Sequence, residues 1–137
     1  IGIVSLSEDE FFASSGVRSS VEAARNALSD KIQYLTEFLG GEYEIQGAYP
    51  AWEYRKESPL RDKMVEVYET MYGQKPEVVA IHAGLECGLF YKKIDGLDCV
   101  SLGPDMKDIH TSEEVLDIAS TERVWKYLVK VLEELKD

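Results

Sequence analysis

The chain has 137 residues, of which 45% are hydrophobic and 30% carry a charge, a balance typical of a globular domain with a buried core. Its formal net charge of −11 argues against nucleic-acid binding, because phosphate contacts require a basic surface. Its apolar runs are far shorter than the roughly 20 residues of a membrane span, so we expect neither nucleic acid nor membrane among its partners.

The first part of the chain predicts a β-hairpin, a long helix and one more strand. The hairpin is predicted over residues 1–17, whose strand-like ends flank a polar turn. Ser19 and Glu22 have the spacing of a capping box, and the apolar periodicity that follows predicts a helix ending at Gly40. Residues 43–49 predict a further strand.

The second part predicts alternating helices and strands. Ser58 and Pro59 are typical of a helix start, and Gly73 of a helix end. Residues 76–82 contain four successive apolar residues, which indicates a strand buried on both faces. The elements predicted after it are a short helix at 85–94, a strand at 98–102, a polar loop at 103–115 and a helix capped by Ser120.

We therefore predict an α/β chain in two parts. Residues 1–55 have the order ββαβ of an α+β piece, and residues 56–137 have the order αβαβα of units around a parallel sheet. Each part is small for an independent core. Since Ile1 falls within a predicted strand, we expect the chain to be a fragment of a longer protein.

The stretch AIHAGLECGLF, residues 80–90, joins a strand-like run to a predicted helix. His82 and Glu86 would lie on opposite sides of the turn, so the stretch is either an ordinary junction or part of a functional site. Cys87 could be a nucleophile activated by His82. We favour packing instead, because Cys87 and Cys99 both lie in apolar surroundings typical of buried free thiols in a cytoplasmic protein.

His110 lies in the polar loop between a predicted strand and a helix, where ligands of open α/β sheets gather. One histidine is not a zinc site, which needs at least three protein ligands. Arg18, between a strand and a helix, could clamp a carboxylate, although a surface ion pair is the favoured interpretation. The acidic residues expected to orient a metal-bound imidazole of His110 are Asp105, Asp108, Glu113 and Glu114.

Several motifs closely resemble the aminoacyl-histidine dipeptidases, the Xaa-His or carnosinase-type branch of the M20 metallopeptidases. The most specific are HAGLECG at residues 82–88 and SLGPDMKDIHTSEE at 101–114, followed by ERVWKYL. The resemblance covers essentially the whole chain. The motifs VRSS at 17–20, YPAWEY at 49–54 and SPLR at 58–61 resemble the same family in the same order.

The resemblance implies an α/β catalytic domain interrupted by a smaller lid domain. Residues 1–55 would be part of the lid, or dimerisation, domain, and residues 56–137 the C-terminal part of the catalytic domain. Family members hold two divalent metals, usually zinc and possibly cobalt or manganese, which activate a water for peptide hydrolysis. The chain would then lack most of the metal ligands and the general base, so we expect it to be inactive when isolated.

The resemblance also implies roles for individual residues. His110 corresponds to the last metal-ligand histidine, and Gly84, Leu85 and Glu86 would lie on the substrate side of the cleft. Glu86 is not the family's general base, and the chain itself would supply no catalytic residue. Arg18 has no family role that we can assign. The expected substrate of the parent enzyme is a carnosine-like Xaa-His dipeptide, and its expected location is the cytoplasm.

Two alternatives remain at the level of the sequence. The chain could be a non-catalytic binding or dimerisation module, and missing strands would favour a homo-oligomer through the lid or exposed sheet edges. It could also be a cysteine hydrolase that uses Cys87 and His82. Thiol-blocking reagents would inhibit the latter, whereas a metallopeptidase would respond to chelators.

Overall fold

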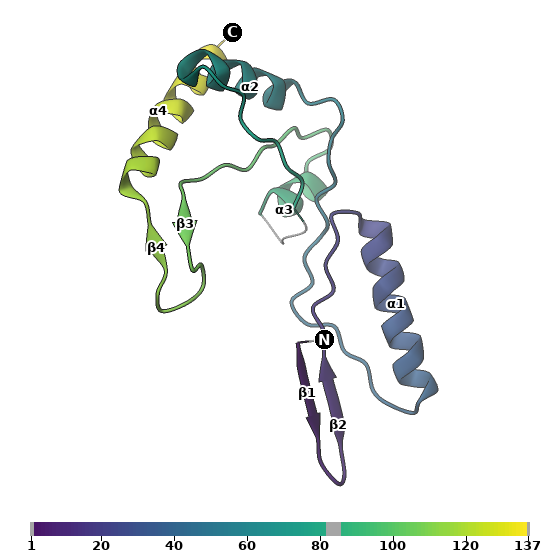
Figure 1. Cartoon of the computed structure of the whole chain (residues 1–137). Coiled ribbons are helices and arrows are strands. Elements are labelled where there is room, and N and C mark those ends of the chain that lie inside the picture. Colours follow the sequence, from purple (N-terminus) through teal and green to yellow (C-terminus); the bar gives the residue numbers. More distant parts are fainter. Residues whose placement is uncertain (1, 82–85, 137) are drawn as a thin grey trace. The chain divides into compact units, whose positions relative to one another are not determined.

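The computed structural model describes residues 2–81 and 86–136. The chain divides into two units (Figure 1). The first contains Ile1–Tyr54 and Ala80–Ile94, and the second contains Arg55–Val79 and Asp95–Asp137. The division into a lid part at 1–55 and a catalytic part at 56–137 stays a prediction.

The first unit begins with the predicted hairpin. Strands β1 (Ile3–Leu6) and β2 (Phe11–Ser14) pair antiparallel, with Ile3 opposite Ser14 and Leu6 opposite Phe11 (Figure 1). The turn is closed by Ser7, whose backbone N–H donates to the Glu10 carbonyl at 2.8 Å and whose Oγ accepts from the Glu10 N–H at 3.0 Å. The side chain of Ser7 thus stabilises the tight connection between the strands.

Helix α1 (Glu22–Phe38) confirms the predicted helix but not its capping box. Val21 occupies the N-cap position and provides no side-chain cap. The Oγ of Ser19 accepts from the Val21 N–H at 3.0 Å, and the Glu22 N–H donates to Oε1 of Glu53, 31 residues further along the chain, at 3.0 Å. A carboxylate from outside the helix therefore satisfies a free N–H group that the local motif was expected to satisfy.

Helix α3 (Glu86–Lys93) packs closely, at Gly88, on the backbone of residues 50–52. Gly88 is buried, and a Cβ atom at this position would lie 3.0 Å from the Pro50 carbonyl oxygen and 3.5 Å from Cβ of Trp52. Glycine is required here because any side chain would push the helix away from the backbone at residues 50–52.

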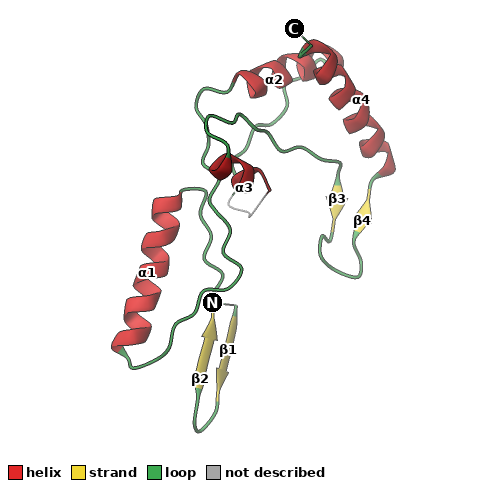
Figure 2. Cartoon of the chain, turned by 180° about the vertical axis from the view of Figure 1, so that it is seen from behind, coloured by secondary structure: helices red, strands yellow, loops and turns green. Residues whose placement is uncertain are grey.

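The second unit is built on two helices, α2 (Pro59–Tyr72) and α4 (Ile118–Glu134) (Figure 2). Apolar side chains recur at helical spacing on both and meet in a small core. Tyr127 adds a polar contact, since its hydroxyl donates to the Met64 carbonyl at 2.7 Å, and its ring lies edge-on to Tyr68 at 5.4 Å. The buried apolar side chains of this core are Met64, Val67, Tyr127 and Val131.

The ends of α2 are as predicted, whereas the start of α4 is not. Ser58 caps α2 by accepting from the Arg61 N–H at 3.1 Å, and Gly73 ends it with a left-handed φ of 70°. The cap of α4 is Asp117 rather than Ser120, because Oδ1 of Asp117 accepts from the Ser120 N–H at 2.6 Å. The hydroxyl of Ser120 serves another contact, described with the candidate site below.

The polar loop predicted at 103–115 contains a second hairpin. Strands β3 (Met106–Lys107) and β4 (Val115–Leu116) pair antiparallel, with Met106 opposite Leu116 (Figure 2). Two-residue strands leave almost no alternating pattern in a sequence, so the sequence could not reveal them.

Three predicted strands are absent, which corrects the predicted orders ββαβ and αβαβα. The structure describes all of residues 43–49, 76–81 and 98–102 and assigns no strand to them, while residue 82 lies outside the described part. The run predicted to be buried is exposed, with Val79 at 61%. A strand depends on hydrogen bonds to a neighbouring strand, and each hairpin of the described chain pairs only within itself.

Among the described residues, no helix is both long enough and apolar enough to cross a membrane.

Candidate functional site

His110 lies in the loop that joins β3 to β4, with a backbone conformation uncommon for residues other than glycine. Its φ is 68°, and that of Asp108 is 51°. A residue other than glycine pays a conformational penalty of about 1–3 kcal/mol in such a sparsely populated region, and surrounding contacts must hold it there. Strain of this kind concentrates at functional sites.

Hydrogen bonds within the loop provide those contacts. The His110 N–H donates to Oε2 of Glu114 at 2.7 Å. Thr111 donates twice to the Asp108 carbonyl, from its N–H at 3.1 Å and from its Oγ1 at 2.7 Å. The backbone of His110 is thereby fixed while its side chain stays exposed, so the imidazole is presented outward from a defined position.

The base of the hairpin is tied to the start of α4. The Asp105 N–H donates to Oγ of Ser120 at 2.8 Å, and the Asp117 N–H donates to the Asp105 carbonyl at 3.0 Å. Arg123 adds an ion pair with Asp105 at 3.2 Å, although both side chains are exposed and the contact contributes little. Ser120 is 2% exposed, so its hydroxyl forms a buried link between the helix and the hairpin that carries His110.

The role expected of the acidic residues, orienting a metal-bound imidazole of His110, stays a prediction. Glu114 accepts a hydrogen bond from the backbone of His110 rather than from its imidazole. No group of three histidine, cysteine, aspartate or glutamate side chains within residues 2–81 and 86–136 is arranged to hold a metal ion. His110 can contribute one ligand, and the described residues do not by themselves make a zinc site.

The stretch at 80–90 is only partly described. Gly84 and Leu85, like His82, lie outside the described residues, so their substrate roles stay predictions. Glu86 is exposed and is the first residue of α3, where a carboxylate favours the helix dipole. Cys87 and Cys99 do not form a disulfide, and both are half-buried rather than buried as expected.

Arg18 is exposed between β2 and α1, and its role also stays open.

Nothing in the sequence indicated the role of Asp98, whose carboxylate accepts hydrogen bonds at the N-terminus of α2. Its Oδ1 accepts from the Ser58 hydroxyl at 2.7 Å, and its Oδ2 accepts from the Leu60 N–H at 3.0 Å. Burial raises the pKa of Asp98, but these hydrogen bonds and the charges of Arg55 and Arg61 outweigh it, so the pKa lies below its usual value. Asp98 is 40 residues from Ser58 in sequence, which hides it from any local motif.

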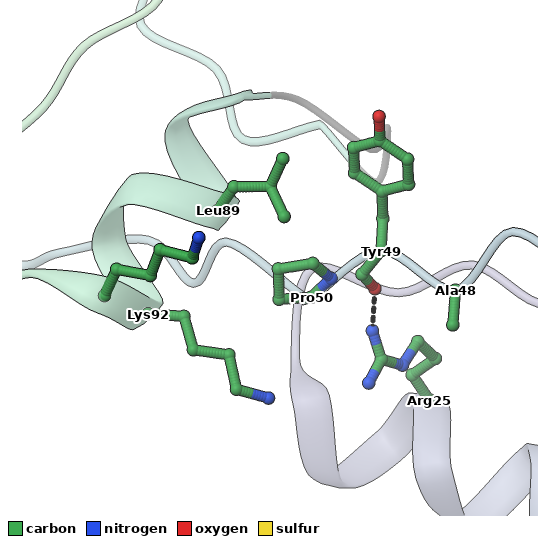
Figure 3. Close-up of a pocket in the computed structure, with 7 residues that line it drawn as sticks. Arg25, Ala48, Tyr49, Pro50, Leu89 and Lys92 are labelled. Atoms are coloured by element: carbon green, nitrogen blue, oxygen red, sulfur yellow. Dashed lines mark hydrogen bonds between the residues drawn. The ribbon is translucent and has the colours of Figure 1, made fainter.

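A pocket of about 200 Å³ lies in the first unit, between α1, the segment at 48–50 and α3 (Figure 3). Figure 3 shows Arg25 and Lys92 on either side of Pro50, with the Arg25 guanidinium donating to the Tyr49 carbonyl. Cationic and apolar side chains share its lining, which consists of Arg25, Ala48, Tyr49, Pro50, Leu89, Lys92 and Lys93.

The class of protein that the chain resembles is the dipeptidases. No family model matches the chain. It is 30% identical over 135 residues to the cytosol non-specific dipeptidase of Escherichia coli (strain K12), a match that covers 98% of this chain and 28% of that protein.

A solved structure gives the same result. The crystal structure of the aminoacylhistidine dipeptidase from Vibrio alginolyticus matches with a TM-score of 0.68 and 35% identity, over 85% of this chain and 24% of that one. The resemblance to the aminoacyl-histidine dipeptidases is thus confirmed, as is the α/β fold class, although the strand orders need the corrections above. The chain spans about a quarter of the length of these relatives.

Proposed function

We propose that this chain is part of a metal-dependent dipeptidase of the M20 type that hydrolyses Xaa-His dipeptides in the cytoplasm. The observation that carries the proposal is the position of His110. A residue in a rare left-handed conformation, held by its backbone and by a hairpin anchored on α4, lies within the motif that resembles the family's last metal ligand. The similarity to two dipeptidases supports the same activity.

The proposed roles follow the resemblance residue by residue. His110 binds one of two divalent metals, zinc or possibly cobalt or manganese, and Gly84, Leu85 and Glu86 line the substrate side of the cleft. The metals, when bound, activate the water that attacks the peptide bond. The remaining ligands and the general base come from the rest of a longer protein, because His110 alone does not satisfy zinc.

The experiment compares the isolated chain with the longer protein. The isolated chain, supplied with zinc, cobalt or manganese, is expected to leave carnosine-like dipeptides uncut. In the longer protein, His110→Ala is expected to lower activity by at least a hundredfold and to reduce bound metal, because a first ligand is lost.

The matched control is Glu133→Gln, a charge change on an exposed face of α4. It should retain both activity and metal content. Turnover by the isolated chain would contradict the proposed dependence on outside ligands, and full metal content in His110→Ala would contradict the ligand role.

The exposed hairpin of β1 and β2 favours a second candidate function, self-association. Strands β1 and β2 pair only with each other, and apolar side chains are exposed along both, from Leu6 at 78% to Phe12 at 50%. Unpaired strand edges with apolar side chains are templates for pairing with another chain. We propose that the hairpin mediates a homo-oligomer; a compact monomer by size-exclusion chromatography with light scattering, at every concentration, would contradict this.

A further inference from the structure

The pocket between α1 and α3 carries a charge opposite to that of the chain. The whole chain has 26 acidic and 15 basic residues, yet the three charged side chains that line this pocket are all basic. Glu22 is the acidic partner nearby, with Oε1 at 3.3 Å from Arg25 and 3.4 Å from Lys92. Glu53 is a second carboxylate nearby, since its Oε1 accepts from the Glu22 N–H at 3.0 Å, but no acidic side chain lines the pocket itself, so the lining keeps an excess of positive charge.

The cations differ in how firmly they are held. The Arg25 guanidinium donates to the Tyr49 carbonyl and pairs with Glu22, so it is a fixed positive charge at the pocket wall. Lys93 forms no ion pair with any described residue, and its ammonium can donate to a ligand. Lys92 shares Glu22 with Arg25 over a long contact, and an anion can compete for it.

The rest of the lining is apolar. Ala48 and Pro50 come from the segment that follows α1, and Leu89 comes from α3, the helix that also carries Lys92 (Figure 3). The volume of about 200 Å³ is below the roughly 300–1,000 Å³ of pockets for drug-sized ligands. Small size, apolar walls and a cationic rim together fit an anionic head group attached to a small hydrophobic body.

We propose that this pocket binds a carboxylate attached to a small apolar group. The carboxylate lies between Lys92, Lys93 and Arg25, and the apolar group contacts Pro50 and Leu89. A free organic acid and the C-terminal carboxylate of a short peptide present the same chemistry. All residues that line the pocket belong to the first unit, and the binding proposed here does not require peptidase activity.

The test uses the 137-residue chain and nuclear magnetic resonance titrations of the backbone amides at residues 48–49 and 89–93. The probes are 3-phenylpropionate, the uncharged 3-phenylpropionamide, inorganic phosphate and N-acetylglycylphenylalanine. We expect saturable shifts with 3-phenylpropionate, at least tenfold weaker binding of the amide and of phosphate, and weaker binding at high salt. Tighter binding of the peptide than of the free acid would support the proposal and assign the peptide as source.

The variant K92Q/K93Q is expected to weaken binding of 3-phenylpropionate about tenfold, because two charge-assisted contacts are lost. The control K126Q/K130Q removes two charges from α4, in the other unit, and should bind within twofold of the parent chain. Equal binding of acid and amide, equal binding of phosphate, or unchanged binding by K92Q/K93Q with its circular dichroism intact would overturn the proposal.

Discussion

Single residues in this chain are fixed by partners that the local sequence does not reveal. Ser58 was predicted as a cap from its place before Pro59, but its hydroxyl also needs an acceptor, which Asp98 supplies. Asp98 could not be recognised in advance, because only the fold brings it to the start of α2. His110 was identified by its motif, whereas its left-handed backbone became visible only in the structure.

Replacing Gly88 by alanine should lower the free energy of unfolding of the first unit by about 1–3 kcal/mol, as overpacking does. The added methyl would meet the Pro50 carbonyl oxygen at 3.0 Å, and backbone cannot rotate away as a flexible side chain can. Urea unfolding followed by tryptophan fluorescence would measure the loss. Gly16→Ala is the control, since open space surrounds a Cβ there and the change should be neutral or slightly stabilising.

Replacing Asp98 by asparagine should destabilise the second unit by about 1–3 kcal/mol near pH 7, because an amide cannot accept both hydrogen bonds as a carboxylate does. The folded pKa of Asp98 lies below its value in the unfolded chain, about 3.9. The stabilisation is therefore present above about pH 5 and is lost as the pH falls through the folded pKa.

Urea unfolding at near-neutral and at acidic pH would measure the effect of Asp98→Asn. The difference between the parent chain and the variant should shrink as the carboxylate is protonated. Asp95→Asn, at an exposed position nearby, should show no such pH-dependent difference. A gap that stays constant down to pH 3 would refute the assigned role of the Asp98 charge.

At the scale of elements, the helices and the local hairpin of β1 and β2 were predictable, whereas the strands that need a distant partner were not. The helices α1, α2, α3 and α4 all appear near their predicted places, because apolar periodicity and end signals lie within each segment. The strands expected at 43–49, 76–82 and 98–102 depended on neighbours, which the sequence pattern could not supply. Even the apolar run Val78–Ile81 stays unpaired over its described length.

The pairing of α2 with α4 should depend strongly on Val131. This residue is 2% exposed in a small core, so Val131→Ala should lower the free energy of unfolding by about 2 kcal/mol through lost burial and a residual cavity. Circular dichroism during urea unfolding would report it. Val129, 38% exposed on the same helix, gives the matched substitution, and Val129→Ala should change stability by less than about 0.5 kcal/mol.

At the scale of the whole molecule, the described chain buries little apolar side-chain surface for its length. The buried apolar side chains of the described part are the four of the α2–α4 core. The apolar face of α1 is largely uncovered, as Leu28 at 48% and Leu35 at 60% exposed illustrate. This fits a chain that spans about a quarter of its relatives, since we propose that the rest of a longer protein covers these surfaces.

The isolated chain should therefore unfold with an unusually small change in heat capacity. A typical globular domain of 137 residues would give about 1.6–2.1 kcal/mol/K, at about 12–15 cal/mol/K per residue. Because that change follows the apolar surface exposed on unfolding, and much of it is exposed already, we expect less than about 1 kcal/mol/K. Scanning calorimetry over a dilution series would measure it at the dilute limit, where self-association cannot bury the hairpin or α1. A normal value at that limit would mean that the isolated chain covers its apolar surfaces by itself. It would contradict the proposal that the rest of a longer protein covers them.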